Sequence, residues 1–157
     1  MGNAAEKLSI IILAAGQGTR MKSDVPKVLH EIGGRPLLEH VVRTATRLAP
    51  QQIHIVFGHG GEQVKERLAH LPVNWVAQTQ QLGTGHAVSQ AIQHVPDDHV
   101  AMILYGDVPL ISEATLCSLG KAVVGDALAL VTCELAQPFG YGRIIRDATG
   151  RVQKIVE

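Results

Sequence analysis

The chain has 157 residues, of which 46% are hydrophobic and 18% charged, and its formal net charge is zero. This length is near the commonest domain size, so we expect one domain over residues 1–157 with a real hydrophobic core. The composition excludes a disordered chain and gives no sign of a nucleic-acid or membrane partner. No apolar run is long enough to span a membrane, and residues 1–7 lack the layout of a signal peptide. We therefore expect a cytoplasmic protein.

The first predicted element is a buried strand over residues 8–12, which is short, β-branched and followed by glycines. It leads into the loop Leu-Ala-Ala-Gly-Gln-Gly-Thr-Arg-Met, residues 13–21, continued by Pro26 and Lys27. Small residues let backbone N–H groups come close to an anion or a planar ring, while Arg20 and Lys27 add positive charge. The loop indicates a nucleotide site at the carboxyl end of a strand, where open α/β sheets usually bind ligands.

Two well-known glycine motifs do not match this loop. The chain lacks the Gly-x-x-x-x-Gly-Lys-Ser/Thr string of a P-loop. The dinucleotide fingerprint needs a third glycine or alanine where Met21 stands and a helix that opens there, whereas polar residues and Pro26 follow. The loop therefore belongs to another kind of nucleotide site.

Strands and helices alternate along the rest of the chain. Apolar residues at helical spacing predict helices over residues 36–48, 62–70, 87–94 and 112–123, with Pro36 as a first helical residue and Ser112 as an N-cap. Apolar runs predict strands over residues 52–57, 73–77, 100–104 and 127–134, and a hairpin over 143–146 and 152–156. The wholly apolar run 100–104 is predicted to be central in the sheet. The pattern predicts a Rossmann-like, doubly wound, mainly parallel α/β sheet.

Cysteine and histidine spacing gives no sign of a metal cluster. Cys117 and Cys133 have no CxxC pattern and lie among apolar residues, so we expect buried, reduced thiols. The eight histidines also lack zinc-ligand spacing, and we interpret them as surface or core imidazoles. Asp97 and Asp98 lie in a Pro-containing turn and are interpreted as solvated turn residues.

Asp107 is the acid with the most informative position. Asp107 follows the carboxyl end of a predicted apolar strand, where its carboxylate is placed to hold Mg²⁺ beside phosphate oxygens. The alternative for Asp107 is a turn residue before Val108 and Pro109. Arg20 and Lys27 have a similar alternative as solvated surface cations, but their places around a glycine loop predict that they stabilise phosphate charge during catalysis.

Several strings resemble one enzyme family. Residues 13–21, with Pro-Lys five residues after the methionine, resemble the signature of sugar-1-phosphate nucleotidyltransferases. Residues 23–30, Ser-Asp-Val-Pro-Lys-Val-Leu-His, are more closely similar to the bacterial bifunctional N-acetylglucosamine-1-phosphate uridyltransferase / glucosamine-1-phosphate acetyltransferase family. Residues 81–86, Gln-Leu-Gly-Thr-Gly-His, and 105–110, Tyr-Gly-Asp-Val-Pro-Leu, agree with it. The resemblance covers nearly the whole chain.

The resemblance implies a Mg²⁺-dependent reaction of UTP with N-acetylglucosamine-1-phosphate, which gives UDP-N-acetylglucosamine and pyrophosphate for cell-wall peptidoglycan synthesis. Asp107 is the implied metal ligand, and Arg20 and Lys27 are the implied catalytic cations. The implied substrate-binding residues, besides Lys27 and Asp107, are Leu13, Ala14, Ala15, Gly16 and Gly18 around the nucleotide, Gln78, Gly83 and Thr84 at the uracil, Tyr105, Gly106 and Gly142 near nucleotide or sugar, and Glu157 at the sugar.

Members of that family continue beyond the segment matched here. They carry a longer nucleotidyltransferase domain, with an Asn as second metal ligand, and then a left-handed β-helix that transfers an acetyl group. No hexapeptide repeat occurs in this sequence, so we expect a C-terminally incomplete nucleotidyltransferase domain without acetyltransferase activity. Two alternatives stay open: a nucleotide-binding fragment with little turnover, and a nucleotidyltransferase for another sugar or base. A shortened sheet should also leave an open, apolar edge through which copies can associate.

Overall fold

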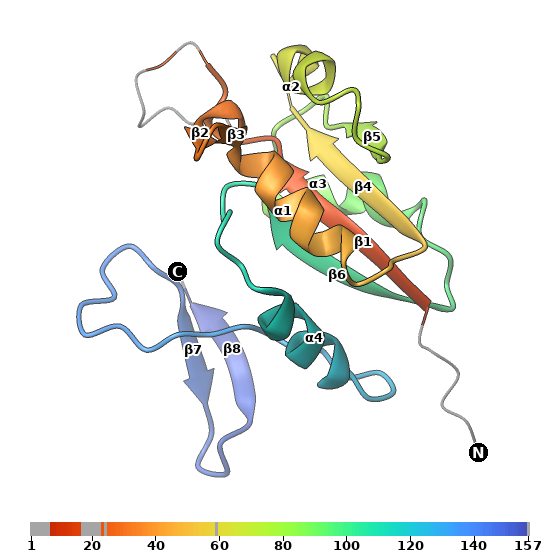
Figure 1. The fold of residues 1–157 in the computed structure, drawn as a ribbon. Helices are drawn as coiled ribbons and strands as arrows, with labels where there is room; N and C mark the ends of the chain where they lie inside the picture. The colour runs from red at the N-terminus through yellow and green to blue at the C-terminus, as the bar shows by residue number, and fades with distance from the viewer. Residues whose placement is uncertain (1–6, 17–22, 24, 59, 157) are drawn as a thin grey trace.

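The computed structural model describes residues 7–16, 23, 25–58 and 60–156. Its centre is a four-stranded sheet with the strand order β5-β4-β1-β6 (Figure 1). All three strand pairs are parallel, as predicted for a doubly wound fold. The strands are β1 (Lys7–Ala14), β4 (Gln52–Phe57), β5 (Asn74–Ala77) and β6 (His99–Tyr105).

Helices follow the strands along the chain. They are the short 3-10 helix η2 (Lys27–Leu29), α1 (Leu37–Thr46), α2 (Glu62–Arg67), α3 (Thr84–Ile92) and α4 (Glu113–Lys121). The small antiparallel pair β2 (Glu31–Ile32) and β3 (Arg35–Pro36) precedes α1 and turns through two glycines with positive φ. An antiparallel hairpin of β7 (Arg143–Arg146) and β8 (Val152–Val156) closes the described chain, as predicted.

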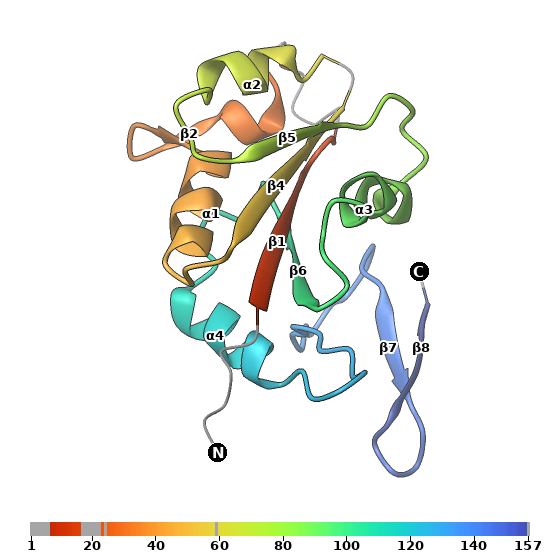
Figure 2. The same cartoon turned by 90° about the vertical axis from the view of Figure 1, so that its right-hand side faces the viewer.

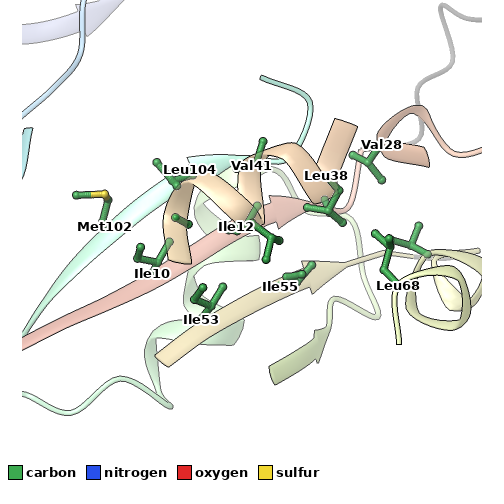
Figure 3. Close-up of a cluster of buried hydrophobic side chains, with 14 of the residues drawn as sticks. Ile10, Ile12, Val28, Leu38, Val41, Ile53, Ile55, Leu68, Met102 and Leu104 are labelled. Atoms are coloured by element: carbon green, nitrogen blue, oxygen red, sulfur yellow. The ribbon is translucent and has the colours of Figure 1, made fainter. Parts of the chain in front are cut away.

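The sheet is covered on both faces. Helices α1, α2 and α4 lie on one face and α3 on the other, so the arrangement has three layers (Figure 2). Alternate residues of β1 point to opposite faces. Ile10 and Ile12 belong to the core under α1, while Ile11 belongs to the smaller core under α3. All three are fully buried, which confirms the predicted buried strand. Ile10 and Ile12 are labelled in Figure 3.

Helix α1 shows how the sequence pattern becomes packing. Leu38, Val41 and Ala45 recur at helical spacing and are fully buried against the sheet. Figure 3 shows Leu38 and Val41 over the strands. The prediction for Pro36 was wrong by one position, because Pro36 pairs with Glu31 in the small sheet and stands before the helix. Ser112 is the predicted N-cap of α4, and its hydroxyl accepts a hydrogen bond from the Thr115 N–H at 3.1 Å.

Two predictions about the sheet were wrong, and they share a cause. β6 is an edge strand, not a central one, with Ile103 42% and Tyr105 53% exposed. Residues 127–134 form no strand, and Leu128 is 85% exposed. An apolar run becomes a buried strand only when a neighbour pairs with it, and among the described residues β6 pairs with β1 alone. In the part of the chain that the structure describes, no strand pairs with the outer edge of β6.

Smaller differences concern the surface. Cys117 and Cys133 are free, as predicted, but exposed, not buried. Cys117 lies on the outer side of α4, and Cys133 lies in the segment that forms no strand. Asp98 is exposed and paired with Lys7 at 2.7 Å, in agreement with a solvated turn. None of the described helices has the length and apolarity needed to cross a bilayer.

Candidate functional site

The parallel strands end along one edge of the sheet. In register, Ala14 of β1 pairs with Phe57 of β4, Phe57 pairs with Ala77 of β5, and Leu13 pairs with Tyr105 of β6. The segments that follow these four strands are therefore neighbours, although they are far apart in the sequence. This edge is where ligands of open α/β sheets bind, as the sequence predicted.

Lys27 and Asp107 meet at this edge. The Lys27 ammonium donates to Oδ2 of Asp107 at 2.6 Å, and the two side chains are 42% and 33% exposed. Lys27 lies in η2, which is anchored by Val28 in the core under α1. Asp107 follows the last residue of β6 by two positions. The structure thus joins a predicted phosphate-binding cation to the predicted metal ligand, with both groups still open to solvent.

Gly106 holds Asp107 close to the end of β1. Its N–H donates to the Leu13 carbonyl at 2.9 Å. A Cβ atom at Gly106 would lie 3.0 Å from Cδ1 of Leu38 and 3.2 Å from the Leu13 oxygen, so the position accepts only hydrogen without a shift of its neighbours. The predicted residues Leu13, Gly106 and Asp107 therefore form one packed unit.

Gly58 and Gln81 complete the edge on the other side of β1. The Gln81 side-chain amide donates to the Ala15 carbonyl at 3.1 Å. A Cβ atom at Gly58 would lie 2.8 Å from that same carbonyl oxygen. Sequence analysis did not name Gly58 or Gln81 as site residues. Gly58 directly follows β4 and Gln81 lies in the loop between β5 and α3, and these positions were the signal that could have found them.

Gln78, Gly83 and Thr84 also lie together. The Gln78 side chain is 3% exposed, and its amide nitrogen donates to the Gly83 carbonyl at 3.2 Å. The same nitrogen lies 2.9 Å from Nδ1 of His86. Gly83 has a φ of +97° and turns the chain into α3, which begins at Thr84. The predicted uracil-contacting residues therefore form one turn beside the strand ends, and their contact with a base stays a prediction.

Other predicted site residues are placed less directly. Tyr105, at the end of β6, is half-exposed beside Leu13. Gly142 immediately precedes β7, whose strand partner is β8, and the hairpin lies apart from the sheet in both views (Figures 1 and 2). Gly18, Arg20 and Glu157 lie outside the described residues, as does most of the predicted glycine loop after Gly16.

The described residues contain no group of three or more His, Cys, Asp and Glu side chains arranged to hold a metal ion. Asp107 nevertheless suits a hard cation, because its carboxylate is partly exposed and already binds an ammonium group. Mg²⁺ usually binds to one or two carboxylates together with substrate phosphates and water, not to a cage made of protein alone. The arrangement therefore fits a cation that arrives with a phosphorylated ligand.

Comparison with known proteins identifies a matching family and several relatives. The profile of the MobA-like NTP transferase domain matches residues 10–154. A curated protein from Aromatoleum aromaticum, named bifunctional protein GlmU, is 57% identical over 150 residues, covering 96% of this chain and 33% of that protein. A relative of the same name from Legionella pneumophila is 56% identical over 155 residues, covering 96% of this chain and 34% of its own length. The chain thus spans about a third of these relatives.

Solved structures share the fold. HddC from Yersinia pseudotuberculosis, complexed with GMP-PN, superposes with a TM-score of 0.76 at 22% identity, covering 96% of this chain and 69% of its own. A nucleotidyl transferase from Methanothermobacter gives a TM-score of 0.69 at 23% identity, covering 76% of this chain and 59% of its own. At such identities the likeness extends to the fold alone.

Proposed function

This chain belongs to the family of MobA-like NTP transferase domains, and we propose that it transfers the uridylyl group of UTP to N-acetylglucosamine-1-phosphate. The products are UDP-N-acetylglucosamine, a precursor for cell-wall synthesis, and pyrophosphate. The observation that carries the proposal is the Lys27–Asp107 pair, 2.6 Å apart at the strand ends beside the loop of β1. The resemblance of residues 23–30 and 81–86 to the uridyltransferases supports the choice of base and sugar.

The reaction makes one bond and breaks one bond at the same phosphorus. A phosphate oxygen of N-acetylglucosamine-1-phosphate attacks the α-phosphorus of UTP. The bond from that phosphorus to the α–β bridging oxygen breaks, and its electron pair leaves with pyrophosphate. Such a reaction depends on positioning and on charge stabilisation more than on proton transfer. No residue of the chain needs to act as a nucleophile.

The residues at the strand ends supply both the positioning and the charge stabilisation that the reaction requires. The Lys27 ammonium offsets negative charge on the phosphates, and Arg20, outside the described residues, is assigned the same role. Ala14, Ala15 and Gly16 let the nucleotide approach the backbone, because they carry little or no side chain. Asp107 would hold Mg²⁺, which when bound offsets charge on the triphosphate. Lys27 must then exchange its bond to Asp107 for a bond to phosphate.

The test is pyrophosphate release by the purified chain supplied with UTP, N-acetylglucosamine-1-phosphate and Mg²⁺. We expect release from the wild type and a loss on the order of 100-fold or more in Asp107→Asn, since the carboxylate charge is gone. Asp98→Asn is the matched control, because Asp98 is also an aspartate paired with a lysine, Lys7, but far from the strand ends. It should leave release unchanged.

The same experiment separates the alternatives. A folded chain that binds UTP without releasing pyrophosphate would be a nucleotide-binding fragment, and the proposed catalysis would be wrong. Faster release with another nucleoside triphosphate or sugar phosphate would assign the chain to another sugar-1-phosphate nucleotidyltransferase. Release that is insensitive to Asp107→Asn would remove the assigned role of Asp107.

A further inference from the structure

The orientation of the Gln78 amide is determined by its neighbours. A backbone carbonyl can only accept hydrogen bonds, so the atom of Gln78 that faces the Gly83 oxygen at 3.2 Å is the amide nitrogen. This choice matters because the oxygen and nitrogen of a glutamine amide are assigned from the hydrogen-bond network. The nitrogen has two hydrogens, and the Gly83 carbonyl takes one of them.

The second hydrogen of that nitrogen points to His86. The distance from Nε2 of Gln78 to Nδ1 of His86 is 2.9 Å. Nδ1 must therefore accept, which makes His86 a neutral imidazole with its hydrogen on Nε2. On the other side of the ring, the amide nitrogen of Gln90 lies 3.3 Å from Nε2 of His86, so a hydrogen on Nε2 requires the Gln90 amide to turn and present its oxygen instead. Two bonds of the Gln78 amide nitrogen, to the Gly83 carbonyl and to Nδ1 of His86, thus determine its orientation.

Only the carbonyl oxygen of Gln78 remains for another partner. It makes no hydrogen bond to any residue in the described part of the chain, and it is not among the buried polar atoms left without a partner there. The side chain as a whole is 3% exposed, so the amide has little freedom to turn. Gln78 therefore presents an acceptor, where the sequence alone allowed either a donor or an acceptor.

We infer that His86 is a positioning residue that fixes the Gln78 amide with its oxygen as the acceptor and thereby selects uracil over cytosine. Uracil carries a hydrogen on N3 and donates it to such an oxygen. Cytosine has a bare, accepting N3 at the same place, and two acceptors repel each other. A site that presents an acceptor to N3 of uracil disfavours cytosine, because the mismatched base leaves buried polar groups without hydrogen-bond partners. The inference rests on the proposed function, since it requires a pyrimidine nucleotide at the strand ends.

The test compares the dissociation constants of UTP and CTP, measured by calorimetry on the full chain and two variants. His86→Phe keeps a ring but removes the acceptor, so the preference for UTP over CTP should fall about tenfold, the effect of one lost orienting bond. His86→Asn is the rescue variant, because its amide oxygen can replace Nδ1 as the acceptor. It should keep the wild-type preference within about threefold. A residue that served only the packing of α3 would show no such rescue.

Several results would overturn the inference. An unchanged UTP preference in His86→Phe would show that His86 does not set the amide, while UTP binding itself would leave the proposed function intact. A wild-type chain that binds neither nucleotide would overturn the proposed function and this inference with it. Should His86→Phe fail to fold, the nitrogen-15 spectrum of His86 in the wild type decides, because a hydrogen on Nδ1 would contradict the assigned tautomer.

Discussion

Two apolar segments of this chain differ in how deeply they are buried. Ile10, Ile11 and Ile12 in β1 are fully buried, whereas Leu128 is 85% and Val131 57% exposed in a segment of similar composition. β1 has a paired strand on each side and helices on each face. The second segment has no paired strand in the described part of the chain. The composition of a segment limits how much apolar surface it can bury. Whether that surface is buried depends on the strands and helices that pack against the segment.

The same contrast separates the candidate site from the hairpin. Side chains and carbonyls from the ends of β1, β5 and β6 contact one another, through Leu13 with Gly106 and through Ala15 with Gln81. The strands of the hairpin pair with each other, and its turn is stabilised by Asp147, whose carboxylate accepts from the Thr149 N–H at 2.8 Å. We therefore assign the function to the sheet edge, where residues from several segments contact one another and hold each other in place.

The largest expected effect is on stability. Ile12→Ala removes a fully buried side chain and should lower the free energy of unfolding by about 3 kcal/mol, from lost burial and the cavity left behind. Leu128→Ala, the matched change in the exposed segment, should change it by less than about 0.5 kcal/mol. Urea unfolding followed by circular dichroism measures both. Equal losses would show that residues 127–134 are packed as well as β1.

A smaller effect is expected at Gly106. Gly106→Ala brings a methyl group 3.0 Å from Cδ1 of Leu38 and should cost about 1–2 kcal/mol through overpacking. Gly120 in α4 is the control, since a Cβ there would lie 3.8 Å from Met102, an ordinary contact. Gly120→Ala should be neutral or stabilise by up to about 1 kcal/mol, because alanine favours the helix. Thermal unfolding of both variants tests this; a harmless Gly106→Ala would contradict the close packing.

The outer edge of β6 has no partner strand among the described residues, and this predicts self-association. Unpaired strand edges with exposed apolar side chains pair with other chains, so the protein should form dimers at high concentration. Ile103→Lys puts a charge on this strand and should weaken the association about tenfold, as charged residues do on natural sheet edges. Ile155→Lys, in the hairpin, is the control at another exposed isoleucine. Sedimentation equilibrium distinguishes the two, and equal weakening by both would move the interface away from β6.

The smallest effect is a dependence of stability on pH. Burial, and then the stacked His94 imidazole, lower the pKa of His54 below its ordinary value of 6.5. The unfolded chain therefore takes up this proton first as the pH falls. The contribution to stability is complete above about pH 6.5 and is lost as the pH falls toward the lowered pKa. Gln52 accepts from Nε2 of His54, while Nδ1 is buried with no partner among the described residues.

His54→Gln should flatten that pH dependence as the pH falls below about 6.5, because glutamine does not titrate there. His40, which is not in this stack, is the control, and His40→Gln should leave the slope in place. Melting temperatures recorded across this pH range give the answer. A slope that persists in His54→Gln would assign the pH dependence to other groups.

The local pattern of apolar residues in the sequence was enough to predict elements such as α1 and β1. Burial in these elements follows the spacing of their apolar residues. The local pattern failed for β6 and residues 127–134, whose state depends on which strand pairs with them. It predicted that Lys27 and Asp107 share a site, because parallel strands end along one edge. It missed Gly58 and Gln81, since their roles arise from a close approach to the Ala15 carbonyl that only the folded chain shows.

The most direct test of the assignment to the sheet edge is a nitrogen-15 NMR titration of the chain with UTP and Mg²⁺. We predict that the amide signals of Ala15, Gly58, Gly83 and Gly106 move, while those of residues 143–156 stay in place. This result would show the strand ends to be the nucleotide site. Shifts concentrated in the hairpin, or no shifts at millimolar UTP, would contradict the account.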